Sequence, residues 1–294
     1  MKHILRVWVR MLGERVPILA KLLLVVLSPF PRPYLSVARV AGLKASARNR
    51  VWVIGSGPLA GRKLTGLLPD EIGPILTNTM EIECARALSR LMLRGTTILD
   101  VGASYGYYSL LFSRLVGDEG QVYSFEPDPQ TFQRLVHNLA LNQAANVVPV
   151  PLCISNTRGL TRWASFDDEP WLSRMVRGPL PSETGRTHVS PVATLDDFCA
   201  TEEISEHVRL VKIDVEGAEP EVLEGMLRLI RLAKPSILCE LHGPAVAQRV
   251  YASLTKANYA WTMVEDAGEQ RQHILAFPRE GAAYRHERVT ASTV

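Results

Sequence analysis

The chain has 294 residues, an apolar fraction of 47% and a formal net charge of +3. This length allows one large α/β domain with an extension, and the apolar fraction is ordinary for a globular protein. The four cysteines, Cys84, Cys153, Cys199 and Cys239, form no closely spaced pairs. That spacing argues against a disulfide framework and a zinc site, and it is compatible with a reducing compartment.

The positive charge is concentrated at the front of the chain. Residues 1–50 contain ten Lys or Arg residues and one acid, Glu14, which gives +9. Because the whole chain carries +3, the remainder carries −6. A basic front favours attraction to an anionic membrane or to nucleic acid. The acidic remainder offers no basic groove, so nucleic acid is not expected as a partner.

Residues 1–33 are predicted to be a basic amphipathic extension that ends in a Pro-rich linker. In residues 2–16, apolar and basic side chains would fall on different faces of a helix. Residues 18–27 form an apolar run that is too short to span a bilayer. No small-residue cleavage site follows, so a removable signal peptide is not expected. One interpretation is an in-plane anchor, through residues 1–27, on an anionic membrane surface. The alternative is a helix that packs on the domain or mediates dimerisation.

Residues 34–78 are predicted to form an N-terminal hairpin or cap segment. Within it, Gly55-Ser56-Gly57 follows a short apolar run and partly matches a dinucleotide-binding fingerprint. Prolines and glycines then interrupt the helix that this fingerprint requires, and no second strand ending in an acid follows at the right distance. A β-hairpin is therefore favoured over a nicotinamide site. Residues 79–94 have helical spacing, with Glu81 at the start.

The most informative stretch follows that helix. Residues 97–101 predict a buried parallel strand, and residues 107–116 predict a helix. Between them lies a turn that contains Gly102 and Gly106. Residues 122–125 predict the next strand, with Glu126 at its carboxyl end. The order is thus strand, glycine turn, helix, strand and acid.

This unit suits a ligand that contains a nucleoside. Ligands of open parallel sheets bind outside the carboxyl ends of the strands, and a helix N-terminus there offers free N–H groups. Glu126 lies where a carboxylate can accept hydrogen bonds from two ribose hydroxyls. The glycine pattern, with Asp100 before it, is Asp-x-Gly-x-x-x-Gly rather than Gly-x-Gly-x-x-Gly. It therefore favours a ligand without a phosphate to cradle.

The α/β alternation continues beyond Glu126, with one interruption. A predicted inserted hairpin or lid occupies residues 157–192, where tryptophans and charged residues could contact a substrate. Thr194 is expected to cap a helix. Helices are predicted at 129–141, 220–229 and 245–257, and strands at 146–154, 208–215, 235–241, 259–265 and 273–277, the last two as an antiparallel pair.

The strand at 208–215 carries charged residues at alternate positions. Lys212, Asp214 and Glu216 fall on one side, whereas Val211 and Ile213 fall on the other. Burying charged side chains on a central parallel strand costs free energy unless they are paired or have a function. We therefore expect Asp214 to lie at a functional edge of the sheet.

In four blocks the chain resembles the FkbM-type methyltransferases, a family of class I S-adenosylmethionine-dependent methyltransferases. The order and spacing of the blocks match the family as well, over roughly residues 75 to 280. The block around Asp214 is specific to the family, whereas the glycine motif indicates only the wider class. The matching residues are Leu99-Asp100-Val101-Gly102-Ala103-Ser104-Tyr105-Gly106-Tyr107-Tyr108-Ser109, Phe125-Glu126-Pro127-Asp128-Pro129, Thr194-Leu195-Asp196-Asp197-Phe198 and Val211-Lys212-Ile213-Asp214-Val215-Glu216-Gly217-Ala218-Glu219.

The resemblance implies a Rossmann-like α/β fold with a seven-stranded, mostly parallel sheet and helices on both faces. The methyltransferase domain would span residues 79–280, followed by a loose tail at 281–294. S-adenosylmethionine would be the cofactor. The residues implied to bind it are Glu81, Asp100, Gly102, Ala103, Ser104, Gly106, Glu126, Pro127, Cys153, Ile154 and Asp214.

The expected reaction is O-methylation of a hydroxyl on a small molecule, a sugar or a lipid-linked glycan. A hydroxyl acceptor must lose a proton, and the candidate catalytic residues at the sheet edge are Asp214, His242 and Glu240. His242 or Asp214 would be the base. A divalent ion held by Asp214 and Glu240 lacks a third clear ligand, so no metal site is expected.

Two other functions remain open. One is a methyltransferase-like module that binds a membrane or a partner without catalysis, and the other is an NAD-type oxidoreductase. The expected location is cytoplasmic, on the inner face of a membrane if the front of the chain is an anchor. The oligomeric state is not indicated.

Overall fold

A computed structural model describes residues 50–66, 74–75, 81–165, 174–175, 186–266 and 272–279. The chain divides into two compact units, which are described separately. The first comprises Met1–Ile82 with Val136–Gln143, and the second comprises Glu83–Leu135 with Ala144–Val294. The predicted extension at 1–33, the tail at 281–294 and half of the lid, residues 166–173 and 176–185, lie outside the described residues. The predicted domain boundaries stay predictions.

The first unit contains the predicted hairpin. Strand β1 (Trp52–Val53) pairs antiparallel with β2 (Lys63–Leu64). Gly55-Ser56-Gly57 lies in the connection, which is a series of turns closed by a hydrogen bond from Gly61 N to Ile54 O of 2.8 Å. Among the described residues directly after these glycines, 58–66, the chain forms turns and β2 rather than the helix that a dinucleotide site requires. The β1–β2 pairing confirms the predicted hairpin.

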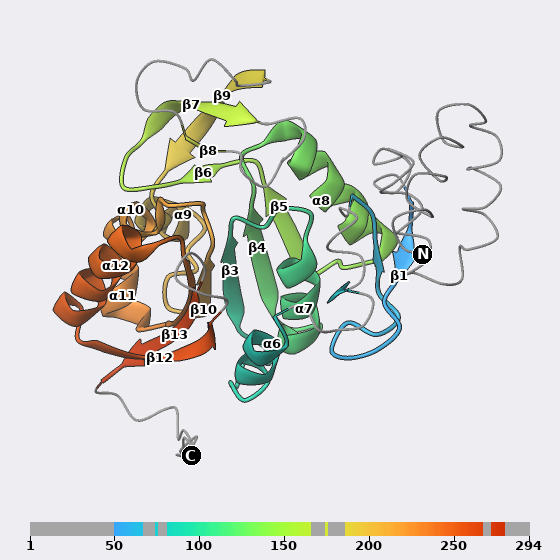
Figure 1. The fold of residues 1–294 in the computed structure, drawn as a ribbon, viewed down its shortest axis with the longest axis horizontal. Helices are drawn as coiled ribbons and strands as arrows, with labels where there is room; N and C mark the ends of the chain where they lie inside the picture. The colour runs from blue at the N-terminus through green and yellow to red at the C-terminus, as the bar shows by residue number, and fades with distance from the viewer. Residues whose placement is uncertain are drawn as a thin grey trace, which may run out of the picture. The chain divides into compact units, whose positions relative to one another are not determined.

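The second unit is built on a seven-stranded sheet (Figure 1). The strand order is β12-β13-β11-β10-β3-β4-β5, and only β13 runs antiparallel to its neighbours. The mostly parallel, seven-stranded sheet implied by the resemblance is therefore confirmed. The strands are β3 (Thr97–Val101), β4 (Gln121–Phe125), β5 (Val147–Val150), β10 (Val208–Ile213), β11 (Ser236–Leu241), β12 (Tyr259–Asp266) and β13 (Gln272–Pro278).

Helices cover both faces of this sheet. Figure 1 shows α10, α11 and α12 on one side and α7 on the other. Thr194 caps α9 as predicted, because its Oγ1 accepts a hydrogen bond from Asp197 N. None of the described helices is both long and apolar enough to cross a membrane. The helices are α6 (Ile82–Leu88), α7 (Tyr107–Val116), α8 (Pro129–Leu141), α9 (Leu195–Thr201), α10 (Glu219–Glu224), α11 (Leu227–Ala233) and α12 (Pro244–Lys256).

Two predicted elements are divided in the structure. The helix expected at 220–229 is split into α10 and α11 at Gly225. A Cβ at Gly225 would lie 2.1 Å from the carbonyl oxygen of Ser155, so the chain packs too closely there for a side chain. The strand expected at 146–154 ends at Val150, and its remainder forms β6 (Cys153–Ile154) in a second sheet. That sheet has the order β6-β9-β7-β8, with β7 (Gly159–Ser165), β8 (Arg174–Met175) and β9 (Arg186–Ala193).

The two faces of the main sheet differ in chemistry. One face supplies apolar side chains, such as Val211 and Ile213, to a core formed with α9–α12. The opposite face carries buried polar groups in adjacent strands. Lys212 on β10 pairs in register with Asp100 on β3, and Asp100 pairs with Ser124 on β4. Side chains directly opposite each other on neighbouring strands share a face, so these three groups are neighbours.

Lys212 is the cation at the centre of this polar face. Its side chain is 5% exposed, and its Nζ lies 3.1 Å from Asp214 Oδ2 and 3.6 Å from Asp100 Oδ1. It also donates a 2.8 Å hydrogen bond to the carbonyl oxygen of Gly102. Burial alone would lower the pKa of Lys212, but the carboxylates of Asp214 and Asp100 raise it above its ordinary value. Lys212 is therefore charged at neutral pH.

Replacing Lys212 by Met should destabilise the fold strongly. The substitution keeps the volume but leaves the buried Asp100 carboxylate without its counter-charge, which costs about 3–5 kcal/mol. Urea denaturation of the full chain measures this change. Lys256→Met, at an exposed position on α12, is the control, with an expected change within about 0.5 kcal/mol.

A double variant separates charge from packing. Lys212→Met with Asp100→Asn removes the uncompensated negative charge, so it should recover part of the lost stability. A Lys212→Met protein as stable as the control would contradict the counter-charge role.

Candidate functional site

The turn after β3 brings two chain segments into close contact. Gly102 has φ +77°, and a Cβ there would lie 1.7 Å from the carbonyl oxygen of Asp214. Only glycine allows β3 and the end of β10 to approach this closely. The amides of Gly102 and Ala103 both donate to the carbonyl oxygen of Phe125, at 3.1 and 2.9 Å. The turn then ends at Gly106, the N-cap of α7, with φ 94°.

Glu126 fixes the next part of this edge. Its Oε2 accepts a 2.9 Å hydrogen bond from Ser104 N, and its Oε1 accepts one of 2.9 Å from Asp128 N. Burial raises the pKa of Glu126 to about 8, although these backbone hydrogen bonds oppose the shift. A carboxylate can accept about four hydrogen bonds, so the two oxygens retain capacity for two hydroxyl donors. Such donors would favour the ionised form.

Asp100 is held beneath the turn. Its carboxylate is fully buried, and Oδ2 accepts a 2.7 Å hydrogen bond from Ser109 Oγ of α7. Burial raises the pKa of Asp100, whereas the Lys212 charge lowers it. Oδ1 has no hydrogen-bond partner among the described residues and faces Lys212 at 3.6 Å. Asp100 thus ties β3, α7 and β10 together below the proposed ligand.

The three predicted catalytic residues meet at the carboxyl ends of β10 and β11. His242 Nε2 lies 3.8 Å from Asp214 Oδ1 and 3.5 Å from Glu240 Oε1. One ligand atom from each of the three residues lies within 4.8 Å of the others, so the set could hold a divalent cation. His242 is the third ligand that the sequence did not identify. These three residues, together with Glu216 and Glu219, which also contact His242, are called the edge cluster below.

Two further acids surround His242 that were not predicted as site residues. Glu219 Oε1 lies 2.7 Å from His242 Nδ1 and also accepts hydrogen bonds from the amides of Val215 and Gly217. Glu216, with φ +54°, places Oε2 3.4 Å from His242 Nε2. The alternation of Lys212, Asp214 and Glu216 in the sequence was the signal for Glu216. Nothing in the spacing indicated that Glu219 would face His242.

The charge states follow from this crowding. Burial by itself would lower the pKa of His242, but the hydrogen bond to Glu219 and the charges of Asp214 and Glu216 raise it to about 9. Burial and the neighbouring carboxylates raise the pKa of Glu216 to about 7, despite the opposing effect of His242. At neutral pH His242 is therefore a cation, and it must lose a proton before it can act as a general base.

The remaining predicted cofactor residues are less closely gathered. Pro127 follows Glu126 directly, and its carbonyl oxygen accepts a 2.9 Å hydrogen bond from Ser190 Oγ. Cys153 and Ile154 are buried on β6, in the second sheet, rather than at the end of a strand of the main sheet. Glu81 is buried but belongs to the first unit. The binding roles of these residues stay predictions.

The protein groups at the described site are chemically suited to the parts of S-adenosylmethionine. The carboxylate of Glu126 suits a ribose, and the glycine turn leads to a helix N-terminus without a phosphate-binding glycine pattern. The edge cluster adds carboxylates that outnumber the cations Lys212 and His242. Such a surface favours a cationic ligand over an anionic one.

Two curated relatives match part of the chain. The methyltransferase sdnD of Sordaria araneosa is 28% identical over 159 residues, which are 44% of this chain and 60% of the relative. The hexuronic acid methyltransferase AglP of Haloferax volcanii is 27% identical over 158 residues, which are 54% of this chain and 61% of the relative. The chain thus spans about three fifths of the length of each relative.

Among solved structures, the FkbM methyltransferase of Methylobacillus flagellatus KT is similar, with 17% identity and a TM-score of 0.46. The match covers 62% of this chain and 43% of that one. Aeropyrum pernix fibrillarin, solved with S-adenosylmethionine, has 17% identity and a TM-score of 0.41, over 66% of this chain and 73% of that one. The sequence pattern of the methyltransferase FkbM domain matches residues 100–277. That match covers more than half of the chain, which therefore belongs to the FkbM methyltransferase family.

Proposed function

We propose that this protein transfers a methyl group from S-adenosylmethionine to an oxygen of a small-molecule or sugar acceptor. The observation that carries the proposal is the excess of carboxylates beside the glycine turn. Asp214, Glu216, Glu219 and Glu240 surround one histidine, His242. A sulfonium cation is attracted to such an edge, whereas the pyrophosphate of a nicotinamide cofactor is repelled.

Each part of the cofactor has a candidate partner. The Glu126 carboxylate would accept hydrogen bonds from the ribose hydroxyls, and the turn from Gly102 to Gly106 would let the ligand approach the backbone. Asp214 would lie toward the sulfonium end, because the short contact with Gly102 joins it to the turn. When bound, S-adenosylmethionine supplies an electrophilic methyl group on a sulfonium.

The acceptor oxygen would lose its proton to a carboxylate. Protonated His242 is poorly suited to that task at neutral pH, whereas Asp214 is held in place by Lys212 at 3.1 Å. We therefore assign the base role to Asp214. His242 would hold the surrounding carboxylates together through its positive charge. Glu240 would position His242 from β11.

The acceptor class is inferred from a relative. AglP is a hexuronic acid methyltransferase, so sugars come first in an acceptor screen. The basic, apolar residues 1–27 suit an acceptor at a membrane or an amphiphilic acceptor, and as an anchor they would hold the protein at the inner face of a membrane. Residues 1–33 lie outside the described residues, so this part of the proposal rests on the sequence. Vesicle sedimentation with and without them would test it.

Replacing Glu126 by Gln tests the ribose assignment. The amide keeps the shape but has one acceptor oxygen and no charge, so affinity for S-adenosylhomocysteine should fall roughly tenfold to a hundredfold. Calorimetric titration measures the change, with NADH as the comparison ligand. Glu119→Gln, at an exposed position before β4, should bind as the wild type does. Unchanged affinity in the Glu126 variant would exclude this carboxylate from the ribose site.

The charge of the edge cluster predicts a pH dependence. From pH 6 to 8 Glu216 loses its proton, and from pH 8 to 10 His242 loses its positive charge. Both changes make the site more negative. Affinity for cationic S-adenosylmethionine should therefore rise relative to that for neutral S-adenosylhomocysteine, by on the order of tenfold across this range. The ratio of the two affinities cancels the effect of the amino and carboxyl groups, which both ligands carry.

A variant of His242 isolates the contribution of its positive charge to the affinity ratio. His242→Gln removes the positive charge, so at pH 8 the affinity ratio should exceed the wild-type ratio at the same pH. His207→Gln, an exposed histidine before β10, should leave the ratio unchanged. A ratio that stays flat with pH and is unaffected by His242→Gln would refute electrostatic recognition of the sulfonium.

A further inference from the structure

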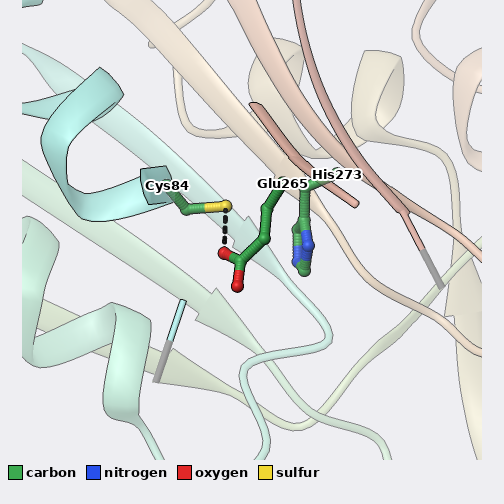
Figure 2. Close-up of side chains that lie close together, drawn as sticks. All are labelled: Cys84, Glu265 and His273. Atoms are coloured by element: carbon green, nitrogen blue, oxygen red, sulfur yellow. Dashed lines mark hydrogen bonds between the residues drawn. The ribbon is translucent and has the colours of Figure 1, made fainter. Parts of the chain in front are cut away.

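A second group of metal-ligating side chains lies beyond the edge cluster. Figure 2 shows Cys84, Glu265 and His273 converging from α6, β12 and β13. Cys84 Sγ lies 3.6 Å from Glu265 Oε2, and one ligand atom from each residue lies within 4.8 Å of the others. All three residues belong to the second unit of the chain. The group is called the thiol cluster below.

The sheet register explains why two of these side chains meet. Glu265 on β12 pairs directly with His273 on β13, and His273 pairs on its other side with Glu240 on β11. The three side chains therefore form a row on one face of three adjacent strands. Cys84, on α6, is completely buried next to this row, and His273 is 3% exposed. Rigid elements thus position all three ligands.

The spacing matches a tetrahedral metal centre. With a zinc–sulfur bond of about 2.3 Å and a zinc–oxygen bond of about 2.0 Å, a tetrahedral angle places sulfur and oxygen about 3.5 Å apart. The observed separation of Cys84 Sγ and Glu265 Oε2 is 3.6 Å. Thiolate, imidazole and carboxylate are also the ligand types that zinc takes. Two ligands therefore need almost no rearrangement to share one ion.

We propose that Cys84, Glu265 and His273 bind a divalent transition metal of the zinc type, with water as a fourth ligand. Binding forms a metal–sulfur bond and releases the thiol proton of Cys84 to solvent, so no oxidant or reductant is needed. The isolated cysteines gave no such signal in the sequence. The site exists because the fold joins residues 84, 265 and 273.

Glu240 links the thiol cluster to the edge cluster. Its Oε2 lies 3.2 Å from His273 Nε2, and its Oε1 lies 3.5 Å from His242 Nε2. A carboxylate next to a metal-bound histidine stabilises the positive charge that metal binding brings to the ring. A metal at the thiol cluster would thus be linked to His242 through the side chain of Glu240. The inference does not depend on the proposed methyl transfer.

Cobalt titration of the reduced full-length protein tests the site. Co²⁺ bound to a thiolate gives an intense charge-transfer absorption in the near ultraviolet, which the sulfur-free edge cluster cannot produce. We expect one equivalent of Co²⁺ per chain to develop this band and Zn²⁺ to abolish it. Cys84→Ala should remove the band. Cys199→Ala, a buried cysteine in α9, is the matched control and should retain it.

Two more variants test the other ligands. His273→Ala and Glu265→Gln should each weaken Co²⁺ binding by at least about tenfold, whereas His207→Ala should not. Circular dichroism and S-adenosylhomocysteine titration show whether each variant is folded, independently of the metal. A wild-type protein without the charge-transfer band would overturn the proposal. So would a band that persists in folded Cys84→Ala.

Discussion

The buried ammonium group of Lys212 is the interaction on which the rest of this site depends. It lies between Asp100 and Asp214 and holds the carbonyl oxygen of Gly102 at 2.8 Å. Two acids on adjacent parallel strands would repel each other in a medium of low dielectric constant, so a cation between them is a condition of the fold. The same cation fixes the glycine turn. One side chain therefore contacts the glycine turn, Asp100 on β3 and Asp214 at the end of β10.

His242 explains how a carboxylate-rich edge can exist beside Lys212. Asp214, Glu216, Glu219 and Glu240 gather around it. The hydrogen bond to Glu219 and the charges of Asp214 and Glu216 raise the pKa of His242 to about 9 against the effect of burial. The site thus keeps a fixed positive charge at neutral pH while the carboxylates still outnumber the cations. That excess of negative charge discriminates between ligands by their charge. The excess negative charge attracts a sulfonium cation, has little effect on a neutral thioether and repels a pyrophosphate. In the proposed reaction the same imbalance would favour product release, because transfer of the methyl group removes the ligand's positive charge.

The sequence predicted those parts of the fold that depend on local pattern. The strand at 97–101, the helix at 107–116 and the cap at Thr194 follow from apolar runs and side-chain chemistry, and all are found. The close approach of Gly225 to the distant carbonyl of Ser155, at the break between α10 and α11, is a tertiary contact that no local pattern could indicate. The candidate site divides in the same way. Asp214 was predicted from alternation along one strand. The contact of Glu219 with His242, and the convergence of Cys84 with His273, arise only when separate elements pack.

Glu240 gives the two clusters a common electrostatic element. One of its oxygens faces His242 and the other faces His273, so a change of charge at either histidine acts electrostatically on the same carboxylate. A metal bound by the thiol cluster would add positive charge near Glu240, and this would weaken the hold of Glu240 on His242. The sheet register, which places Glu240 beside His273, therefore puts one carboxylate between the proposed metal site and the carboxylate-rich edge around His242.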